Sequence, residues 1–140
     1  MANIFHLSEL TSLALHSILI IAASDKRLVN TKKIAATIGA SEAHLAKALQ
    51  QLTKAGFIRS VRGPKGGFAL LKKANEITLL DVYEAVEGQM EIEGCPMNSE
   101  KCAFETCIFG GVPKKLNQKF RQYMGNKKLS DFNKTLKHNS

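Results

Sequence analysis

Apolar residues recur with the spacing of an α-helix through the first half of the chain. The segment from Ser8 to Ala23 has this pattern, and Ser8 is placed to cap its first turn. Its apolar positions include Leu10, Leu13, Ala14, Ile18 and Ile21. The pattern predicts a first helix over 8–23.

Two shorter helical segments follow, separated by a glycine. A helix over 32–38, capped by Asn30 or Thr31, ends at Gly39, because glycine readily adopts the left-handed conformation that stops a helix. A third helix is predicted over 42–55, with leucines and alanines on one face. Two short helices joined by a tight glycine-containing turn are typical of a helix-turn-helix.

After the third helix the pattern changes to that of β-strands. Segments 57–62 and 68–71 are β-prone, and the sequence Gly63-Pro-Lys-Gly-Gly between them predicts a tight hairpin. A fourth helix is predicted over 77–86, with Thr78 as its cap. The hairpin therefore has the position of a wing beside the helix-turn-helix.

The chain divides into three parts. Residues 1–88 predict a winged helix-turn-helix, which makes the fold mainly α with a small β-hairpin. The irregular segment 89–111 holds every cysteine of the chain. Residues 112–140 predict a C-terminal helix, with apolar residues at helical spacing over 113–123, and then a short helix over 130–136.

The chain is basic. Lys and Arg outnumber Asp and Glu by 20 to 12, a formal net charge of +8 at pH 7, which favours a polyanion such as nucleic acid or an anionic membrane surface. The apolar run 13–23 is interrupted by His16 and Ser17 and is too short to span a bilayer, and the N-terminus lacks a signal-peptide pattern. We therefore expect a cytoplasmic protein with reduced cysteines and no membrane partner.

A basic helix-turn-helix beside a basic hairpin favours double-stranded DNA as the polyanion. The second helix of such a motif enters the major groove with its N-terminal residues, and a wing arginine suits the narrow minor groove. A solvated charged surface and a winged helix that binds protein are the alternatives. The candidate DNA-binding residues are Ser41, Glu42, His44 and Lys47 on the helix and Arg59, Arg62 and Lys65 on the wing.

Cys95, Cys102 and Cys107 are the only cysteines, and they lie within 13 residues. Three thiols in a polar loop do not make a simple disulfide framework and favour a soft metal centre with a fourth ligand from elsewhere. A zinc site with a histidine ligand, or a thiol switch in which Lys101 favours a neighbouring thiolate, are the alternatives. We expect no enzyme, because a cysteine nucleophile needs a histidine beside it and no nucleotide-binding loop or paired catalytic carboxylates are present.

Three motifs carry a resemblance to a known family. The first helix opens with Leu7-Ser-Glu-Leu-Thr-Ser-Leu-Ala-Leu, and the wing is Val61-Arg-Gly-Pro-Lys-Gly-Gly-Phe. The fourth helix contains Ile77-Thr-Leu-Leu-Asp-Val-x-x-Ala-Val-Glu-Gly. Together they resemble the winged-helix bacterial transcription regulators that include IscR, NsrR and CymR, and the resemblance covers nearly the whole chain.

The resemblance implies a regulator, most often a repressor, that binds a palindromic operator as a homodimer. The helix from about Gly111 to Met124 would pair with its copy, and Arg62 would be the wing arginine that enters the minor groove. The resemblance also implies an iron–sulfur cluster, [2Fe-2S] or [4Fe-4S], in the three-cysteine loop, whose state (altered by iron supply, oxidants or nitric oxide) would control operator binding. Lys65 replaces a common glycine and adds charge at the wing tip. His44 replaces a common aromatic residue on the recognition helix, so the sequence preference is expected to differ.

The fourth cluster ligand is also implied by the resemblance. Some members of the family use an acid and a histidine on the first helix of the partner subunit. Alignment of residues 7–15 places Ser12 at the acid position and His16 at the histidine position. His16 is therefore the expected ligand, and Ser12 and Glu9, on the same helix face, are the alternatives.

Overall fold

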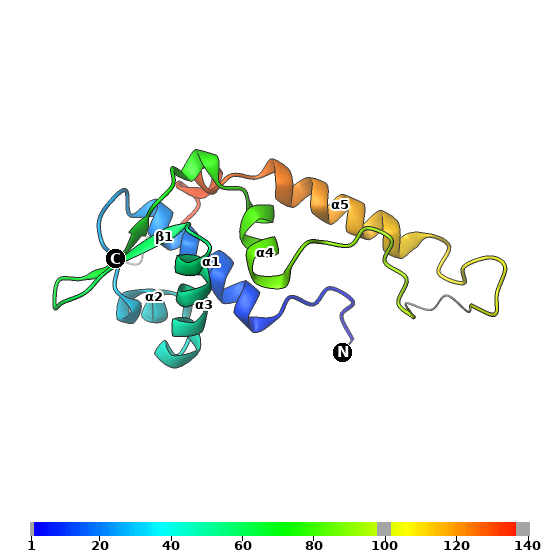
Figure 1. Ribbon diagram of the computed structural model, residues 1–140, viewed down its shortest axis with the longest axis horizontal. Helices are drawn as coiled ribbons and strands as arrows, with labels where there is room; N and C mark the ends of the chain where they lie inside the picture. The colour runs from blue at the N-terminus through cyan, green and yellow to red at the C-terminus, as the bar shows by residue number, and fades with distance from the viewer. Residues whose placement is uncertain (1, 98–101, 137–140) are drawn as a thin grey trace.

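The computed structural model describes residues 2–97 and 102–136, which form a winged helix-turn-helix with a long C-terminal helix (Figure 1). The helices are α1 (Glu9–Ala23), α2 (Thr31–Ile38), α3 (Glu42–Lys54), α4 (Leu79–Glu87) and α5 (Val112–Asn126). Strands β1 (Ile58–Val61) and β2 (Gly67–Leu70) form one antiparallel hairpin. Short 3-10 helices are η1 (Ala74–Glu76) and η2 (Leu129–Phe132). The predicted mainly α fold with a small β-hairpin is confirmed.

Helix α1 is the centre of the fold. It packs against α2, α3, α4, β2 and η2, and its side chains at Ala14, Ile18 and Ile21 are almost completely buried. A helix that is apolar on nearly every side has to be covered by other elements. The partners that cover it supply their own buried side chains, among them Ile34, Leu45, Leu49, Leu52, Val82 and Leu129.

The helices begin and end at residues that the sequence identifies as caps. The side chains of the N-cap residues accept hydrogen bonds from backbone N–H groups in the first turns of their helices, and Gly39 ends α2 with φ of +68°. The four N-caps with this contact are Ser8, Asn30, Ser41 and Thr78. The predicted boundaries of α2 and α3 are therefore correct to within one residue.

The wing is joined to the chain that enters α2. The Val29 N–H donates to the Phe68 carbonyl oxygen at 3.0 Å, and the Phe68 N–H donates to the Val29 oxygen at 2.8 Å. Gly67 lies against this join, and a Cβ added there would lie 2.7 Å from the carbonyl carbon and oxygen of Val29. Only glycine lets the two backbones approach this closely. The hairpin and the helix-turn-helix are therefore connected by backbone hydrogen bonds as well as by covalent links.

Helix α5 is attached to the rest of the molecule at its C-terminal end. The Leu79 N–H donates to the Lys127 oxygen at 2.9 Å, and the Leu129 N–H donates to the Ile77 oxygen at 3.0 Å. The helix continues past its predicted end at 123 and includes Gly125. Gly125 faces Leu80 of α4, where an added Cβ would make ordinary van der Waals contact. Beyond it the expected helix over 130–136 is replaced by η2, which these backbone bonds hold in place.

A carboxylate fastens the beginning of α1 to the end of α4. The Ser8 hydroxyl donates to Glu87 Oε1 at 2.6 Å, and the Thr11 hydroxyl donates to the same oxygen. These two hydrogen bonds lower the pKa of Glu87 below its ordinary value of 4.5, because they stabilise the ionised form. The contact joins residues that are distant in sequence and restrains the start of the central helix.

Replacement of Gly67 tests the join between wing and α2. Gly67→Ala should lower the free energy of unfolding by about 2 kcal/mol more than Gly63→Ala, because both positions have positive φ but a Cβ at 63 meets nothing within 4 Å. Urea denaturation of both variants measures the difference. Equal losses would show that backbone conformation alone, and not the contact with Val29, constrains Gly67.

Replacement of Glu87 tests the fastening of α1 to α4. Glu87→Gln should lower the free energy of unfolding at pH 7 by about 0.5 kcal/mol, a small value because the carboxylate is exposed. A carboxylate with a lowered pKa stabilises the fold above its unfolded pKa and loses this effect as the pH falls through the folded pKa. The deficit should therefore be complete at pH 7 and shrink below pH 4.5. Glu91→Gln removes another exposed carboxylate and is the control for the change in net charge.

Candidate functional site

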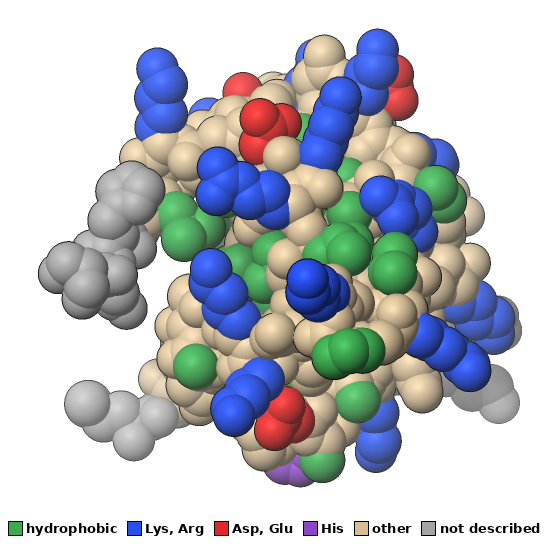
Figure 2. All heavy atoms as spheres, turned by 90° about the vertical axis from the view of Figure 1, so that its left-hand side faces the viewer, with side chains coloured by type: hydrophobic (Ala, Val, Ile, Leu, Met, Phe, Trp, Pro, Cys, Tyr) green, Lys and Arg blue, Asp and Glu red, His purple; other side chains and the backbone are tan. Residues whose placement is uncertain are grey.

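The surface of α3 and the wing is strongly basic. Residues 26–73, which include α2, α3 and the hairpin, contain eleven Lys and Arg residues and one acidic residue, Glu42. Figure 2 looks onto the wing end of the molecule and shows Lys and Arg side chains over most of this face, with only a few acidic ones. All seven predicted DNA-binding residues are exposed. The positive charge of the chain is therefore concentrated in the segment that forms the helix-turn-helix and the wing.

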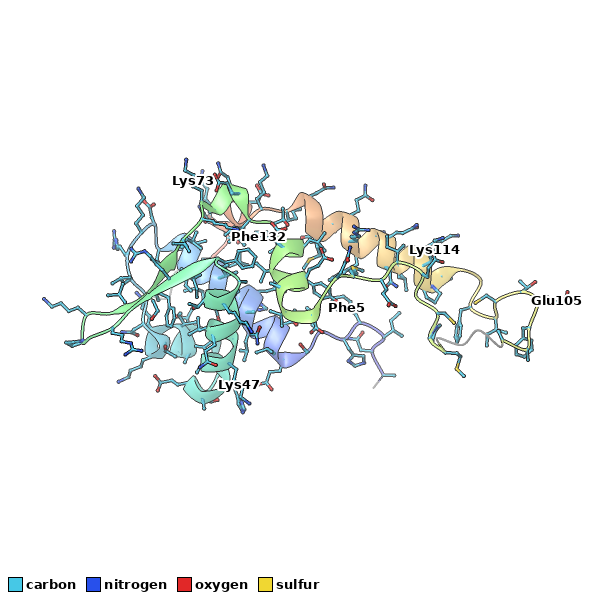
Figure 3. All side chains as sticks on the ribbon, viewed as in Figure 1. Phe5, Lys47, Lys73, Glu105, Lys114 and Phe132 are labelled. Carbon is cyan, nitrogen blue, oxygen red and sulfur yellow. The ribbon has the colours of Figure 1, made fainter. Side chains whose placement is uncertain are left out.

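The N-terminal turn of α3 presents a cap and a histidine in contact with α1. The Ser41 hydroxyl accepts the His44 N–H at 3.2 Å, so this hydroxyl caps the helix. Nδ1 of His44 lies 3.4 Å from Oε1 of Glu9 on α1, with both side chains mostly exposed. Lys47 lies one turn further along α3 and extends from it into solvent (Figure 3). Local sequence signals identified the cap, but the Glu9–His44 pair depends on the packing of α1 against α3.

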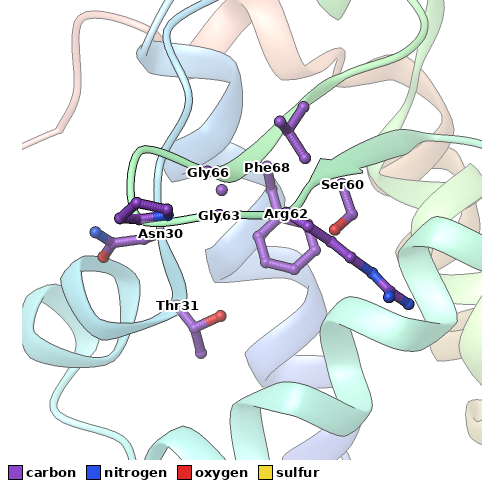
Figure 4. Close-up of a pocket in the computed structure, with 10 residues that line it drawn as sticks. Asn30, Thr31, Ser60, Arg62, Gly63, Gly66 and Phe68 are labelled. Atoms are coloured by element: carbon purple, nitrogen blue, oxygen red, sulfur yellow. The ribbon is translucent and has the colours of Figure 1, made fainter.

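A pocket of about 340 Å³ lies between the wing and the start of α2. In Figure 4, Asn30 and Thr31 lie on one side of the Phe68 ring, and Ser60 and Arg62 lie on the other. The sequence identified Asn30 only as a helix cap, which its hydrogen bond from the Lys33 N–H at 2.8 Å confirms. The join between Val29 and Phe68 brings Asn30 into the lining of the same pocket as Arg62, which no local pattern in the sequence predicts.

The three candidate ligands on α1 do not act together in this structure. The ring nitrogen Nδ1 of His16 lies 2.6 Å from the Ser12 carbonyl oxygen and 3.4 Å from the Ser12 hydroxyl, whereas Glu9 contacts α3. A carbonyl oxygen only accepts, so Nδ1 carries the hydrogen, and in the neutral ring Nε2 keeps its lone pair. His16 also lies at an apolar groove of about 250 Å³, formed by α1, α2 and the C-terminal segment.

The three cysteines are exposed on the loop that precedes α5. This loop extends from the end of α5 opposite to the winged helix, and Figure 3 shows Glu105 in the loop and Lys47 on α3 at opposite sides of the molecule. Within residues 2–97 and 102–136, no three His, Cys, Asp or Glu side chains are gathered where they could hold a metal ion. Lys101, the residue expected to favour a thiolate, lies outside the described residues.

The Rrf2 family model, described as an iron-dependent transcriptional regulator, matches residues 7–135. The chain belongs to the Rrf2 family. It is therefore a member of a family of DNA-binding transcription regulators, and not of an enzyme family. The resemblance inferred from the wing and the fourth helix is confirmed.

Two relatives extend this comparison. An HTH-type transcriptional regulator of Aquifex aeolicus (strain VF5) is 33% identical over 96 residues, which cover 69% of this chain and 67% of the relative. Protein aau3 of Rhizobium meliloti (strain 1021) is 38% identical over 89 residues, which cover 64% of this chain. The match spans 58% of the length of aau3, so the rest of that protein has no counterpart in the alignment.

Solved structures share the fold. CymR (YrzC), the global cysteine regulator of B. subtilis, has a TM-score of 0.77 at 21% identity, covering 96% of this chain and 100% of that chain. IscR of T. potens has a TM-score of 0.74 at 23% identity, covering 95% of this chain and 89% of that chain.

Among the helices of the described residues, none has both the length and the apolar character needed to span a bilayer.

Replacement of Arg62 tests the wing as a DNA contact. Arg62→Ala should weaken binding to a duplex that the native protein selects from a random library by about tenfold, and should reduce the dependence of binding on salt. Fluorescence anisotropy at several salt concentrations measures both effects. Lys73→Ala removes the same charge just before η1 and is the control, because it lies outside the wing. Equal losses in the two variants would show that net charge, and not the wing, carries the effect.

Proposed function

We propose that this Rrf2-family protein is a repressor whose operator binding is controlled by an iron–sulfur cluster held by Cys95, Cys102 and Cys107. The observation that carries the proposal is the exposure of all three thiols on one loop of a chain whose family is described as iron-dependent. Thiolates are the ligands that iron–sulfur clusters use, so the chemistry of the donor set fits the group. Such a cluster, when bound, supplies a centre that iron supply, oxidants or nitric oxide can alter.

His16 is the proposed fourth ligand. Its Nδ1–H donates to the Ser12 carbonyl oxygen at 2.6 Å, the arrangement by which a histidine fixes its tautomer and keeps Nε2 for a metal. Ser12 lies against the same ring and remains an alternative ligand, and Glu9 is a weaker one because it faces His44. The contacts of these three residues therefore favour His16.

A second copy of the chain would bring His16 to the cysteines. The cysteine loop lies at the end of α5 that is remote from the winged helix, so the α1 ligand would come from the partner (Figure 1). An apolar stripe on α5 supports this pairing, because Val112, Leu116 and Tyr123 are about half exposed at helical spacing. Both the cluster and the dimer would then depend on α5.

A homodimer of this kind would bind a palindromic operator. Each copy would place the N-terminal turn of α3 in the major groove, where Glu42, His44 and Lys47 can reach base edges. Arg62 would enter the adjacent minor groove, with Arg59 and Lys65 close to phosphates. The Ser41 N–H, at the start of α3, could bind a phosphate.

The test is the composition of protein purified without oxygen. We expect broad visible absorbance with iron and sulfide present, and we expect Cys102→Ser to lose it while its circular dichroism spectrum stays native. Operator affinity should differ between the cluster-bound and cluster-free forms. Equal affinity of the two forms would rule out control by the cluster even if iron is present.

Mixed dimers test whether His16 binds in trans. One chain carries His16→Ala, and the other carries serine at all three cysteine positions. If His16 acts across the dimer, the mixed dimer keeps one complete site and about half of the native iron, while the serine-substituted homodimer has none. A mixed dimer without iron would place the fourth ligand in the same chain as the cysteines.

A thiol switch or zinc site is the second candidate, and the exposure of the three cysteines favours it because oxidants and zinc can reach them directly. In that case the protein would be colourless. Its DNA binding would respond to peroxide or to a chelator. Metal analysis of the same oxygen-free preparation separates this candidate from the first.

A further inference from the structure

The chain that leads into Cys95 lies along the first two turns of α5. Oε1 of Glu93 is 3.3 Å from Nζ of Lys114, and the Asn117 side-chain amide donates to the Ile92 carbonyl oxygen at 3.5 Å. Lys114 and Asn117 are three residues apart, so they share one face of the helix. This face of α5 therefore contacts two successive residues just before the first cysteine.

Gly94 makes the closest contact in this region. Its φ is +65°, and a Cβ added there would lie 2.5 Å from Nδ2 of Asn117 and 3.2 Å from the carbonyl carbon and oxygen of Pro113. The backbone of residue 94 thus lies directly on the first turn of α5. Since consecutive Cα atoms are about 3.8 Å apart, the Cα atom of Cys95 lies close to the first turn of α5.

The other end of the cysteine loop leads directly into the same end of α5. The Gly110 N–H donates to the Cys107 carbonyl oxygen at 3.0 Å, and the Val112 N–H donates to the Phe109 oxygen at 3.0 Å. These bonds fold residues 107–112 into a compact turn that leads directly into α5. Cys107 therefore enters the helix through a hydrogen-bonded turn, and not through an extended linker.

We propose that Gly94 and Asn117 are positioning residues that hold Cys95 at the N-terminal end of α5, where Cys107 is already held. Two of the three thiols are then placed by one helix before any metal binds, and Cys102 supplies the third. Holding ligands in place before binding strengthens a metal site, because less of their freedom is lost when the metal arrives. The inference deepens the proposed function and rests on it for the role of the thiolates.

The test is Co²⁺ binding by the reduced, metal-free, full-length protein, followed by the thiolate-to-cobalt charge-transfer absorbance. Gly94→Ala should weaken Co²⁺ binding by about tenfold, the lower end of the range seen when residues that orient metal ligands are changed. Asn117→Ala keeps the backbone conformation and should weaken binding in the same direction by a smaller factor. Thermal unfolding of the metal-free variants checks that the fold is native.

Gly88→Ala is the matched control. Gly88 ends α4, outside the cysteine loop, and also has a positive φ, +90°, but a Cβ there meets nothing within 4 Å. It should leave Co²⁺ affinity within about threefold of native, well below the tenfold loss expected for a residue that orients a ligand. An equal loss in Gly94→Ala and Gly88→Ala, or no loss in either Gly94→Ala or Asn117→Ala, would overturn the positioning role. A native chain that binds no Co²⁺ through its thiols would overturn the proposed metal site as well.

Discussion

The burial of α1 is the constraint on which the rest of this structure depends. Ile18 and Ile21 are covered on all sides by the helix-turn-helix, β2, α4 and η2, so these elements take their positions from one apolar helix. The first turns of the same helix carry Glu9, Ser12 and His16. A metal centre bound by these residues would therefore be attached directly to α1, which packs against α3. Close packing of this kind transmits small displacements, because a dense core does not absorb them.

Helix α5 gives the molecule its second organising feature. Its C-terminal end is hydrogen-bonded to the chain that enters α4. Its N-terminal end contacts Gly94 and follows directly from the turn that contains Cys107. Between these ends, Phe120 packs against Phe5 and Tyr83, with ring centroids 5.5 and 5.4 Å apart. A helix of 15 residues is about 22 Å long. The cysteine loop is therefore far from the winged helix but is connected to it by one rigid element. The helix therefore links the cysteine loop at one end to the chain that enters α4 at the other.

The distribution of charge separates affinity from sequence preference. The basic surface of residues 26–73 attracts any phosphate backbone, so it supports binding to DNA of every sequence. Discrimination between bases would depend on the few side chains at the start of α3 and at the wing. His44 is constrained there by Glu9, and Arg62 lies at a hairpin that is hydrogen-bonded to the entry of α2. The His44 side chain therefore lies against α1, and the hairpin that carries Arg62 is placed by its backbone bonds to the entry of α2.

The sequence by itself determined the elements of this protein, and the tertiary structure decided how they meet. Ser8, Asn30, Ser41 and Thr78 cap their helices, and Gly39 ends α2, because capping and left-handed turns depend on neighbours within a few residues. The periodicity of apolar residues likewise predicted the helices and the hairpin. The close contacts of Gly67 with Val29 and of Gly94 with α5 were not visible in any local pattern. The same holds for the Glu9–His44 pair, the Glu87 hydrogen bonds and the attachment of α5 beside α4. Each of these joins residues that are separated along the chain, and only the tertiary packing brings them together.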